Sequence, residues 1–221
     1  MISFPKILPL ENGDCLSRPE FERRYAAMPQ VKKAELIEGV VYMGSPVRVT
    51  HGMPHGLLMG WLFNYRVATP NVMLADNTTV RLDGDNEPQP DALLRLERGG
   101  QSSISEDGYI EGAPEFIAEV VSSSASYDLG DKLRVYRRTQ VQEYLIWQVY
   151  EQEILWLRLR EGEYVALSPD EQGILKSEVF PGLWLAVNGL IAGRLAEMQA
   201  VLQRGLCSPE FQVFRDTESR G

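Results

Sequence analysis

Apolar residues recur along the chain with two periods, one typical of helices and one typical of strands. Met53–Val67 has apolar side chains every three or four residues, which predicts an amphipathic helix with Pro54 at its first position. The run FIAEVV at residues 116–121 is apolar at every position but one, which predicts a strand buried on both faces. The sequence therefore predicts a globular chain that combines helices with a buried sheet.

Shorter patterns complete the expected order of elements. Before the strand at 116–121 they predict a helix from Ser17 to about Tyr25, either two short strands or one bulged strand over 34–43, and short strands over 72–74 and 78–82. After that strand they predict a helix over about 128–138, a strand in QEYLIWQV, a hairpin over 153–167 and a C-terminal helix over about 188–203. The last dozen residues are expected to fray.

The predicted fold class is α/β, or more loosely α+β, with a mixed sheet flanked by helices. A strand, a helix and a strand follow one another at 116–148, and such a βαβ-like unit is compatible with a mixed sheet. The chain shows no internal repeat or interdomain linker, so we expect one domain over 34–205. Residues 1–33 are expected to form a helical segment packed on it, and residues 206–221 a C-terminal tail.

Composition and charge narrow the class of protein. Apolar residues make up 44% of the 221 residues, which suits a globule with a core, and no stretch approaches the roughly 20 apolar residues of a membrane span. We therefore expect a cytoplasmic protein that does not contact membranes. Cys15 and Cys207 lie near opposite ends of the chain, so neither a disulfide framework nor a zinc cluster is indicated.

The formal net charge of −9 argues against a protein that coats nucleic acid electrostatically, because phosphate contacts need a concentrated basic surface. Any contact with nucleic acid must be local. Basic residues gather at 132–138, but a solvated helix face is the better explanation of such a run.

Three charged residues in buried settings are the candidates for chemistry. Glu119 interrupts the apolar strand, and an unpaired carboxylate there would cost several kcal/mol. Asp91 follows Pro90 and enters another apolar run, so the two carboxylates suit Mg²⁺ or Mn²⁺ at adjacent strand ends. Lys132 lies near the start of the next helix, where a nearby anion would explain a cation. The competing interpretation is a buried ion pair between Glu119 and Lys132, with Asp91 capping a turn.

The segments QPDALLRL, APEFIAEVVSSSASYDLGDKLRVYRR and VQEYLIW resemble the bacterial putative restriction endonuclease family within the PD-(D/E)XK nuclease superfamily. The resemblance covers about residues 34–190. It implies a restriction endonuclease-like core with extra N-terminal strands and a C-terminal helix, and a metal-dependent endonuclease that hydrolyses phosphodiester bonds in nucleic acid. DNA is the expected substrate, and the choice between DNA and RNA stays open.

By that resemblance Pro90 and Asp91 form the "PD" and Glu119 is the following acid. Glu35 corresponds to an additional acidic residue, with Glu38 as the competing choice because the two would face opposite sides of a strand. The superfamily lysine should stand at residue 121, where this chain has valine, so the resemblance implies that Lys132 supplies the amine.

Four further residues are candidates for positions around the ligands. Tyr136 lies four residues after Lys132 on the same helix face, and Gln89 and Glu38 neighbour the implied ligands in sequence. His55 could approach the acidic pocket or serve a structural role. His51 and His55 superficially resemble a zinc pair, but Gly52 and Pro54 are expected to break the helix between them.

Two functions from different classes remain after the sequence is read. The first is the metal-dependent endonuclease, with Mg²⁺ or Mn²⁺ as cofactor and DNA as partner. The second is an inactive nuclease-fold protein that serves as a binding or assembly module, which the valine at residue 121 and the acidic net charge favour. A homodimer is expected, with the segment FPGLWL and the C-terminal helix as apolar surface.

Overall fold

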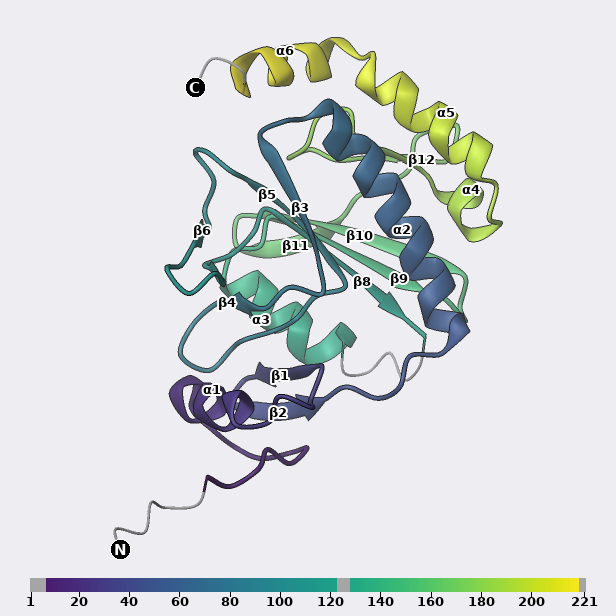
Figure 1. Ribbon diagram of the computed structural model, residues 1–221. Coiled ribbons are helices and arrows are strands. Elements are labelled where there is room, and N and C mark those ends of the chain that lie inside the picture. The colour runs from purple at the N-terminus through teal and green to yellow at the C-terminus, as the bar shows by residue number, and fades with distance from the viewer. Residues whose placement is uncertain (1–6, 123–127, 219–221) are drawn as a thin grey trace, which may run out of the picture.

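A six-stranded mixed sheet forms the centre of the protein (Figure 1). The computed structural model describes residues 7–122 and 128–218. The strands of this sheet lie side by side in the order β11 (Glu163–Ala166), β10 (Glu153–Arg160), β9 (Glu143–Gln148), β8 (Phe116–Val121), β5 (Ala92–Leu96) and β3 (Val72–Asp76). The neighbours β8 and β9 are parallel, and the other pairs are antiparallel. The predicted mixed sheet is confirmed.

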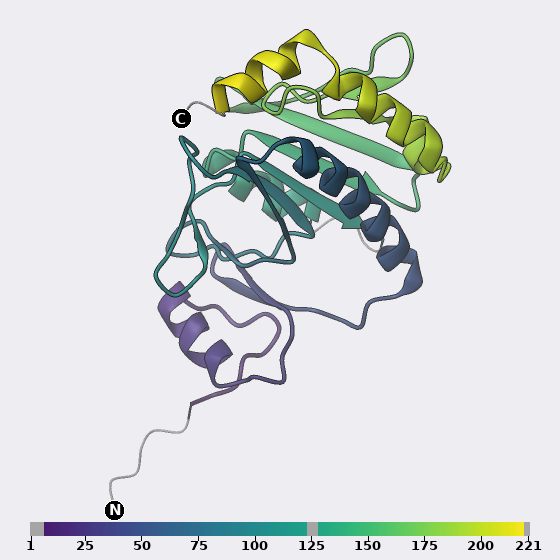
Figure 2. The ribbon, with the colours of Figure 1, turned by 45° about the horizontal axis from the view of Figure 1, so that its top comes forward.

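Smaller elements surround this sheet. Before β8 they are α1 (Arg18–Ala26), β1 (Ala34–Ile37), β2 (Val40–Met43), α2 (Val49–Ala68), β4 (Val80–Arg81), β6 (Ser103–Ile104) and β7 (Ile110–Glu111). After β8 they are a π-helical turn η1 (Asp128–Lys132), α3 (Leu133–Arg138), β12 (Ile174–Lys176), β13 (Trp184–Ala186), α4 (Val187–Ile191), α5 (Leu195–Leu206) and α6 (Pro209–Glu218). The hairpin β1–β2 and the C-terminal helices lie at opposite ends of the molecule in both views (Figures 1 and 2).

The strand β8 is buried on both faces, as its unbroken apolar pattern predicts. Its even-numbered residues pack in one core cluster with α2 and the C-terminal helices. Its apolar odd-numbered residues, Ile117 and Val121, pack in a second cluster with Val135 and Tyr136 of α3. Because side chains alternate along a strand, Glu119 belongs to the face that α3 covers.

The crossover from β8 through α3 to β9 confirms the predicted βαβ-like unit. The predicted helix over 128–138 is present, but it opens with the π-helical turn η1 before α3 begins. Lys132 is the last residue of η1 and directly precedes α3, so its side chain projects from the start of the crossover helix. The segment 34–43 forms two strands joined by a turn at Glu38 and Gly39, which both have positive φ.

The helix α2 starts earlier than the sequence predicts. It begins at Val49, and Pro54 lies inside its second turn rather than at its first position. Proline there forfeits only the bond to the carbonyl of Thr50, an exposed residue that water can reach. The expectation that Gly52 and Pro54 break the helix is therefore wrong.

The C-terminal region also differs from the prediction. One helix was expected over 188–203, but three are present, and Gly193 with a φ of +67° ends the first of them. The last dozen residues were expected to fray, yet α6 spans most of them and buries Phe211 against the ring of Tyr65. An aromatic anchor of this kind holds a terminal helix in place. The proposed division at residues 33 and 205 stays a prediction.

None of the helices in the described part of the chain combines the length and apolar character that a membrane span requires.

Candidate active site

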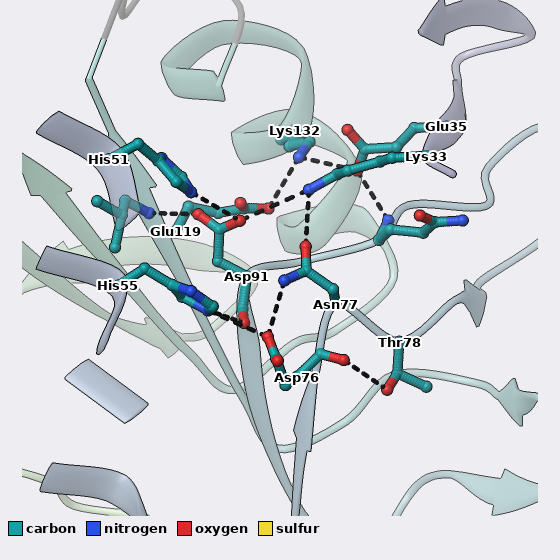
Figure 3. Close-up of polar contacts among 12 residues, drawn as sticks. Lys33, Glu35, His51, His55, Asp76, Asn77, Thr78, Asp91, Glu119 and Lys132 are labelled. Carbon is teal, nitrogen blue, oxygen red and sulfur yellow. Dashed lines mark hydrogen bonds and ion pairs between the residues drawn. The ribbon is translucent and has the colours of Figure 1, made fainter. Parts of the chain in front are cut away.

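Two carboxylates from neighbouring strands form the base of the candidate site (Figure 3). The antiparallel register pairs Ala92 of β5 with Ala118 of β8, so Asp91 and Glu119 occupy the next pair of opposite positions. Opposite residues of an antiparallel pair place their side chains on the same face. The backbone N–H of Val120 also donates to Oδ2 of Asp91 at 2.9 Å. Both carboxylates are almost fully buried.

Lys132 joins one of these acids to a third. Its Nζ lies 2.8 Å from Oε1 of Glu119 and 2.9 Å from Oε1 of Glu35 on β1. The hydroxyl of Tyr136, one helical turn later on α3, donates to the same Glu119 oxygen at 3.1 Å. The N–H of Gln89 donates to Oε1 of Glu35 at 2.7 Å. Each charged side chain among them has an ion-pair partner of opposite sign, which is what burial at this depth requires.

The phenol of Tyr136 is fully buried beside these groups. Burial, and then the negative charge of Glu119, raise the pKa of Tyr136 well above its usual value. Tyr136 is therefore a neutral hydrogen-bond donor at all working pH values, and it holds the carboxylate of Glu119 in place.

Asp91 meets a second set of partners on its other side. Its Oδ1 lies 3.5 Å from Nζ of Lys33 and 3.6 Å from Nε2 of His51. Burial alone would raise the pKa of Asp91, but the hydrogen bond with His51, the charge of Lys33 and the N–H of Val120 together hold its pKa below the usual value. The carboxylate is therefore ionised at neutral pH and available to a cation.

A short polar chain continues from Asp91 toward β3. Nε2 of His55 lies 3.0 Å from the backbone carbonyl oxygen of Asp91 and 3.1 Å from Oδ1 of Asp76. Lys33 also donates to Oδ1 of Asn77 at 3.2 Å. His51 and His55 share one face of α2, with ring centroids 5.8 Å apart. The two histidines thus border the acidic site without converging on a single point.

The structure brings together most of the residues that the sequence singled out. Glu35, Asp91, Glu119, Lys132 and Tyr136 meet in one place, and Gln89 and His55 touch it through backbone groups. The roles assigned to them stay predictions.

Glu38 does not join them. It lies in the β1–β2 turn, where its carboxylate pairs with Arg134 and Arg138 at the surface. Between the two glutamates, the geometry therefore favours Glu35.

Lys33 is the residue that sequence reasoning missed. It stands two positions before Glu35, and residues two apart along an extended segment face the same side. That spacing was the available signal. His51 was considered only as a zinc ligand, because the helix that carries it was expected to start after it.

The five charged side chains of Lys33, Glu35, Asp91, Glu119 and Lys132 line a cavity of about 250 Å³. Carboxylate oxygens are the ligands that Mg²⁺ and Mn²⁺ prefer, and Asp91 and Glu119 both offer them here. Among residues 7–122 and 128–218, no three acidic, histidine or cysteine side chains converge as a metal cluster. An ion held by two carboxylates would keep several waters, which is the usual situation for Mg²⁺. The donor set fits such an ion.

The architecture is restriction endonuclease-like in class, with a mixed sheet that carries two acids at adjacent strand positions and helices on both faces. Residues 18–188 match the model of the Uma2 family, described as putative restriction endonuclease. The chain belongs to this family. Membership indicates nuclease activity, and with it hydrolysis and contact with nucleic acid; restriction endonuclease-like nucleases generally use divalent metals.

A solved structure supports the fold assignment. The chain is similar to a putative nuclease belonging to DUF820 from Anabaena variabilis, with a TM-score of 0.60 and 15% sequence identity. The match covers 77% of this chain and 96% of that one. No curated protein sequence matches the chain.

Proposed function

We propose that this protein is a Mg²⁺- or Mn²⁺-dependent endonuclease that hydrolyses phosphodiester bonds in DNA. The observation that carries the proposal is the cavity in which Asp91, Glu119 and Glu35 meet the ammonium groups of Lys132 and Lys33. Hydrolysis adds a water oxygen to phosphorus and breaks one P–O bond, which leaves a phosphate monoester and a sugar hydroxyl.

Asp91 and Glu119 are the proposed metal ligands. A bound dication supplies a Lewis acid for the phosphoryl oxygen and lowers the pKa of its water. Three carboxylates and two ammonium groups leave the cavity with a small negative excess, which favours a cation. With a dication added, the same cavity becomes net positive and suits a phosphate.

Lys132 and Glu35 have different proposed roles. Lys132, the last residue of η1, orients Glu119 and stabilises developing negative charge, in place of a lysine at position 121. Val121 lines the cavity with an apolar side chain that also packs in the cluster under α3, so position 121 supplies no amine there. Glu35 holds Lys132 from the opposite side through a contact of 2.9 Å.

Purified protein should be assayed on supercoiled plasmid, linear DNA and RNA with Mg²⁺, Mn²⁺ or EDTA. We expect cleavage of DNA that needs the metal and that falls about 100-fold or more in Asp91→Asn and in Glu119→Gln. Glu38→Gln is the matched control, because it removes a nearby carboxylate outside the cavity. Undiminished activity in Asp91→Asn or Glu119→Gln would refute the proposal.

A second candidate function is a nuclease-fold protein without activity that binds or assembles with partners. It is favoured by the tight hold of two carboxylates on Lys132 and by the lack of a third metal-ligating side chain in the described segments. A metal that binds only the folded state must raise the melting temperature. A rise at millimolar Mg²⁺ or Mn²⁺ that disappears in Asp91→Asn would favour the enzyme, and no rise would favour the binding protein.

We also propose a cytoplasmic location and a homodimer. The apolar segment FPGLWL was expected to provide sticky surface, but Phe180, Leu183 and Leu185 are buried in the core. The part of the argument that rests on this segment is therefore wrong, while the C-terminal helices keep Leu195 and Val213 exposed. The exposed apolar side chains of α2, which include Val49, Met53 and Phe63, are a more suitable surface.

A further inference from the structure

Two lysines reach the carboxylates, and their surroundings differ. Lys132 is 2% exposed and is held by Glu119 and Glu35 at ion-pair distance. The side chain of Lys33 is 30% exposed, and its Nζ lies farther from its carboxylate, at 3.5 Å from Asp91. Lys132 is thus already held by two carboxylates, whereas the partly exposed ammonium of Lys33 can exchange its carboxylate partner for a phosphate.

Lys33 stands where two cavities meet. The inner cavity of about 250 Å³ holds the carboxylates, and an outer groove of about 640 Å³ lies against it. Lys33, His51 and Asp91 line both. Lys33 therefore borders both the groove and the carboxylate cavity, whereas Glu119 lines the cavity alone.

The outer groove carries a second cation. Arg48 precedes α2 and is exposed, and within the described residues its side chain makes no hydrogen bond or ion pair. Most other arginines of the described chain face a carboxylate; Arg81, for example, pairs with three. In a chain of net charge −9, a groove lined by Lys33 and Arg48 is a local exception that suits a polyanion.

The rim of the groove also holds an aromatic ring. Tyr150, in the turn between β9 and β10, is 63% exposed and lines the same groove. An exposed ring beside a basic groove is the combination that binds single strands, because unpaired bases stack on it.

Burial of the acids argues for the same substrate. Asp91 and Glu119 are 4% and 3% exposed, so a scissile phosphate must enter the cavity to meet them. A rigid duplex with its many phosphates would need a broad basic surface, and the groove offers few cations.

We propose that the outer groove binds a single strand of nucleic acid, with Lys33 on the phosphate next to the carboxylates, Arg48 on a phosphate farther out and Tyr150 stacked on a base. The position of the cleaved bond follows from the proposed function, but binding in the groove does not depend on it.

The test measures binding of fluorescently labelled oligonucleotides by anisotropy in EDTA, where hydrolysis is absent. Wild type should bind a single strand more tightly than the duplex of the same sequence. Lys33→Met and Arg48→Gln should each weaken single-strand binding about fivefold or more. Each should also reduce the slope of log K against log salt concentration by about 0.7, the value for one phosphate contact on a single strand. Tyr150→Ser should weaken binding without changing the salt dependence.

Matched controls remove the same charge elsewhere. Lys32 adjoins Lys33 but lines a different cavity, and Arg98 is exposed beside β3. Lys32→Met and Arg98→Gln should bind as wild type does. Lys33→Arg should retain binding, which separates loss of charge from loss of fold, and Arg48→Gln alters a residue that is exposed in the folded protein.

The outcomes separate this proposal from the proposed function. If binding depends on Lys33 and Arg48 but the protein never cleaves nucleic acid, single-strand binding in the groove is supported and the proposed endonuclease activity is refuted. If the wild type cleaves nucleic acid but Lys33→Met and Arg48→Gln bind single strands as tightly as their control variants do, the proposed binding groove is refuted. Tighter binding of duplex than of single strand would also overturn it.

Discussion

At the scale of single residues, burial of a carboxylate is not by itself a sign of catalysis. Glu143 and Glu115 are as buried as Glu119. Glu143 accepts hydrogen bonds from the backbone of Glu178 and Val179, and Glu115 from the backbone of Leu96 and Gln101. The hydrogen bonds of these two acids hold neighbouring loop segments against the sheet. What distinguishes Glu119 is a cationic partner and a cavity.

The ion pairs of Lys132 make a direct prediction. Lys132→Met should lower the free energy of unfolding by about 3 kcal/mol, because it leaves Glu119 and Glu35 facing each other without their cation. Urea denaturation measures this loss.

The matched control is Lys32→Met, which should change stability by less than about 0.5 kcal/mol. In the double variant Lys132→Met with Glu119→Gln, the loss should be smaller than the sum of the single losses, because the two groups interact directly. Simple additivity would contradict a direct ion pair.

The sequence predicted the central residues because charge within an apolar run is visible without a structure. Asp91 and Glu119 stood out in this way, Lys132 stood out because it is a cation near a helix start, and the structure brings the three together. Lys33 did not stand out because it lies among polar neighbours, and only its alternation with Glu35 would have indicated it. Gln89 was named for its place beside Asp91, but its contact with Glu35 is made by the backbone N–H, which the residue type does not reveal.

At the scale of elements, the N-terminal helix α1 meets the loop before β5 through a pair of acids. Burial, and then the hydrogen bond with Glu22 of α1, raise the pKa of Glu87 to about 8. Arg81 lies 2.8 Å from Glu22 and partly offsets the repulsion. Glu87 is therefore protonated in the folded protein at neutral pH, whereas its unfolded pKa is near 4.5.

This difference predicts how stability depends on pH. Between about pH 4.5 and 8 the folded state binds the proton that the unfolded state has released, so this contribution to stability falls as the pH rises. Glu87→Gln keeps a neutral side chain at every pH. It should raise the melting temperature at pH 8 by a few degrees and flatten its decline from pH 5 to 8.

The control is Glu106→Gln, an exposed position that should leave the curve unchanged. Parallel curves for wild type and Glu87→Gln would show that Glu87 is ionised in the folded state.

The helix α5 packs closely against the segment that contains Gly182 and Trp184. A methyl group at Gly205 of α5 would collide with the backbone carbonyl of Gly182 and the ring of Trp184. Gly205→Ala should therefore destabilise the protein by about 2 kcal/mol in denaturant unfolding.

Gly56→Ala and Gly60→Ala on α2 meet open space and should instead stabilise by about 0.5 kcal/mol. If Gly205→Ala behaved as these two do, α5 would not be packed as described.

Element types were predicted better than their ends. The buried strand β8 and the crossover to β9 follow from long apolar runs, which leave few alternatives. The start of α2 was misplaced because proline is most frequent at a first helical position, and here tertiary packing of Leu58, Trp61 and Leu62 favours the longer helix. Packing also explains α6, since the partner of Phe211 lies almost 150 residues away in α2.

At the scale of the whole molecule, the expected homodimer is a measurable property. Light scattering coupled to gel filtration should give twice the mass of the chain. Met53→Glu and Phe63→Glu place charge on the exposed face of α2 and should yield monomers without loss of helix content. Val213→Glu, which changes an exposed apolar residue on α6, is the control. A monomeric wild type would remove the dimer from the proposal.

The origin of Lys132 on a helix rather than on β8 has a consequence for folding. The acids come together as soon as β5 pairs with β8, but the amine arrives only when the crossover helix docks on the sheet. A refolding chain should thus pass through a stage in which two acids stand without their amine and attract dications most strongly. Millimolar magnesium would then populate that stage and slow the last step of refolding, so the kinetics would report on the docking of one helix.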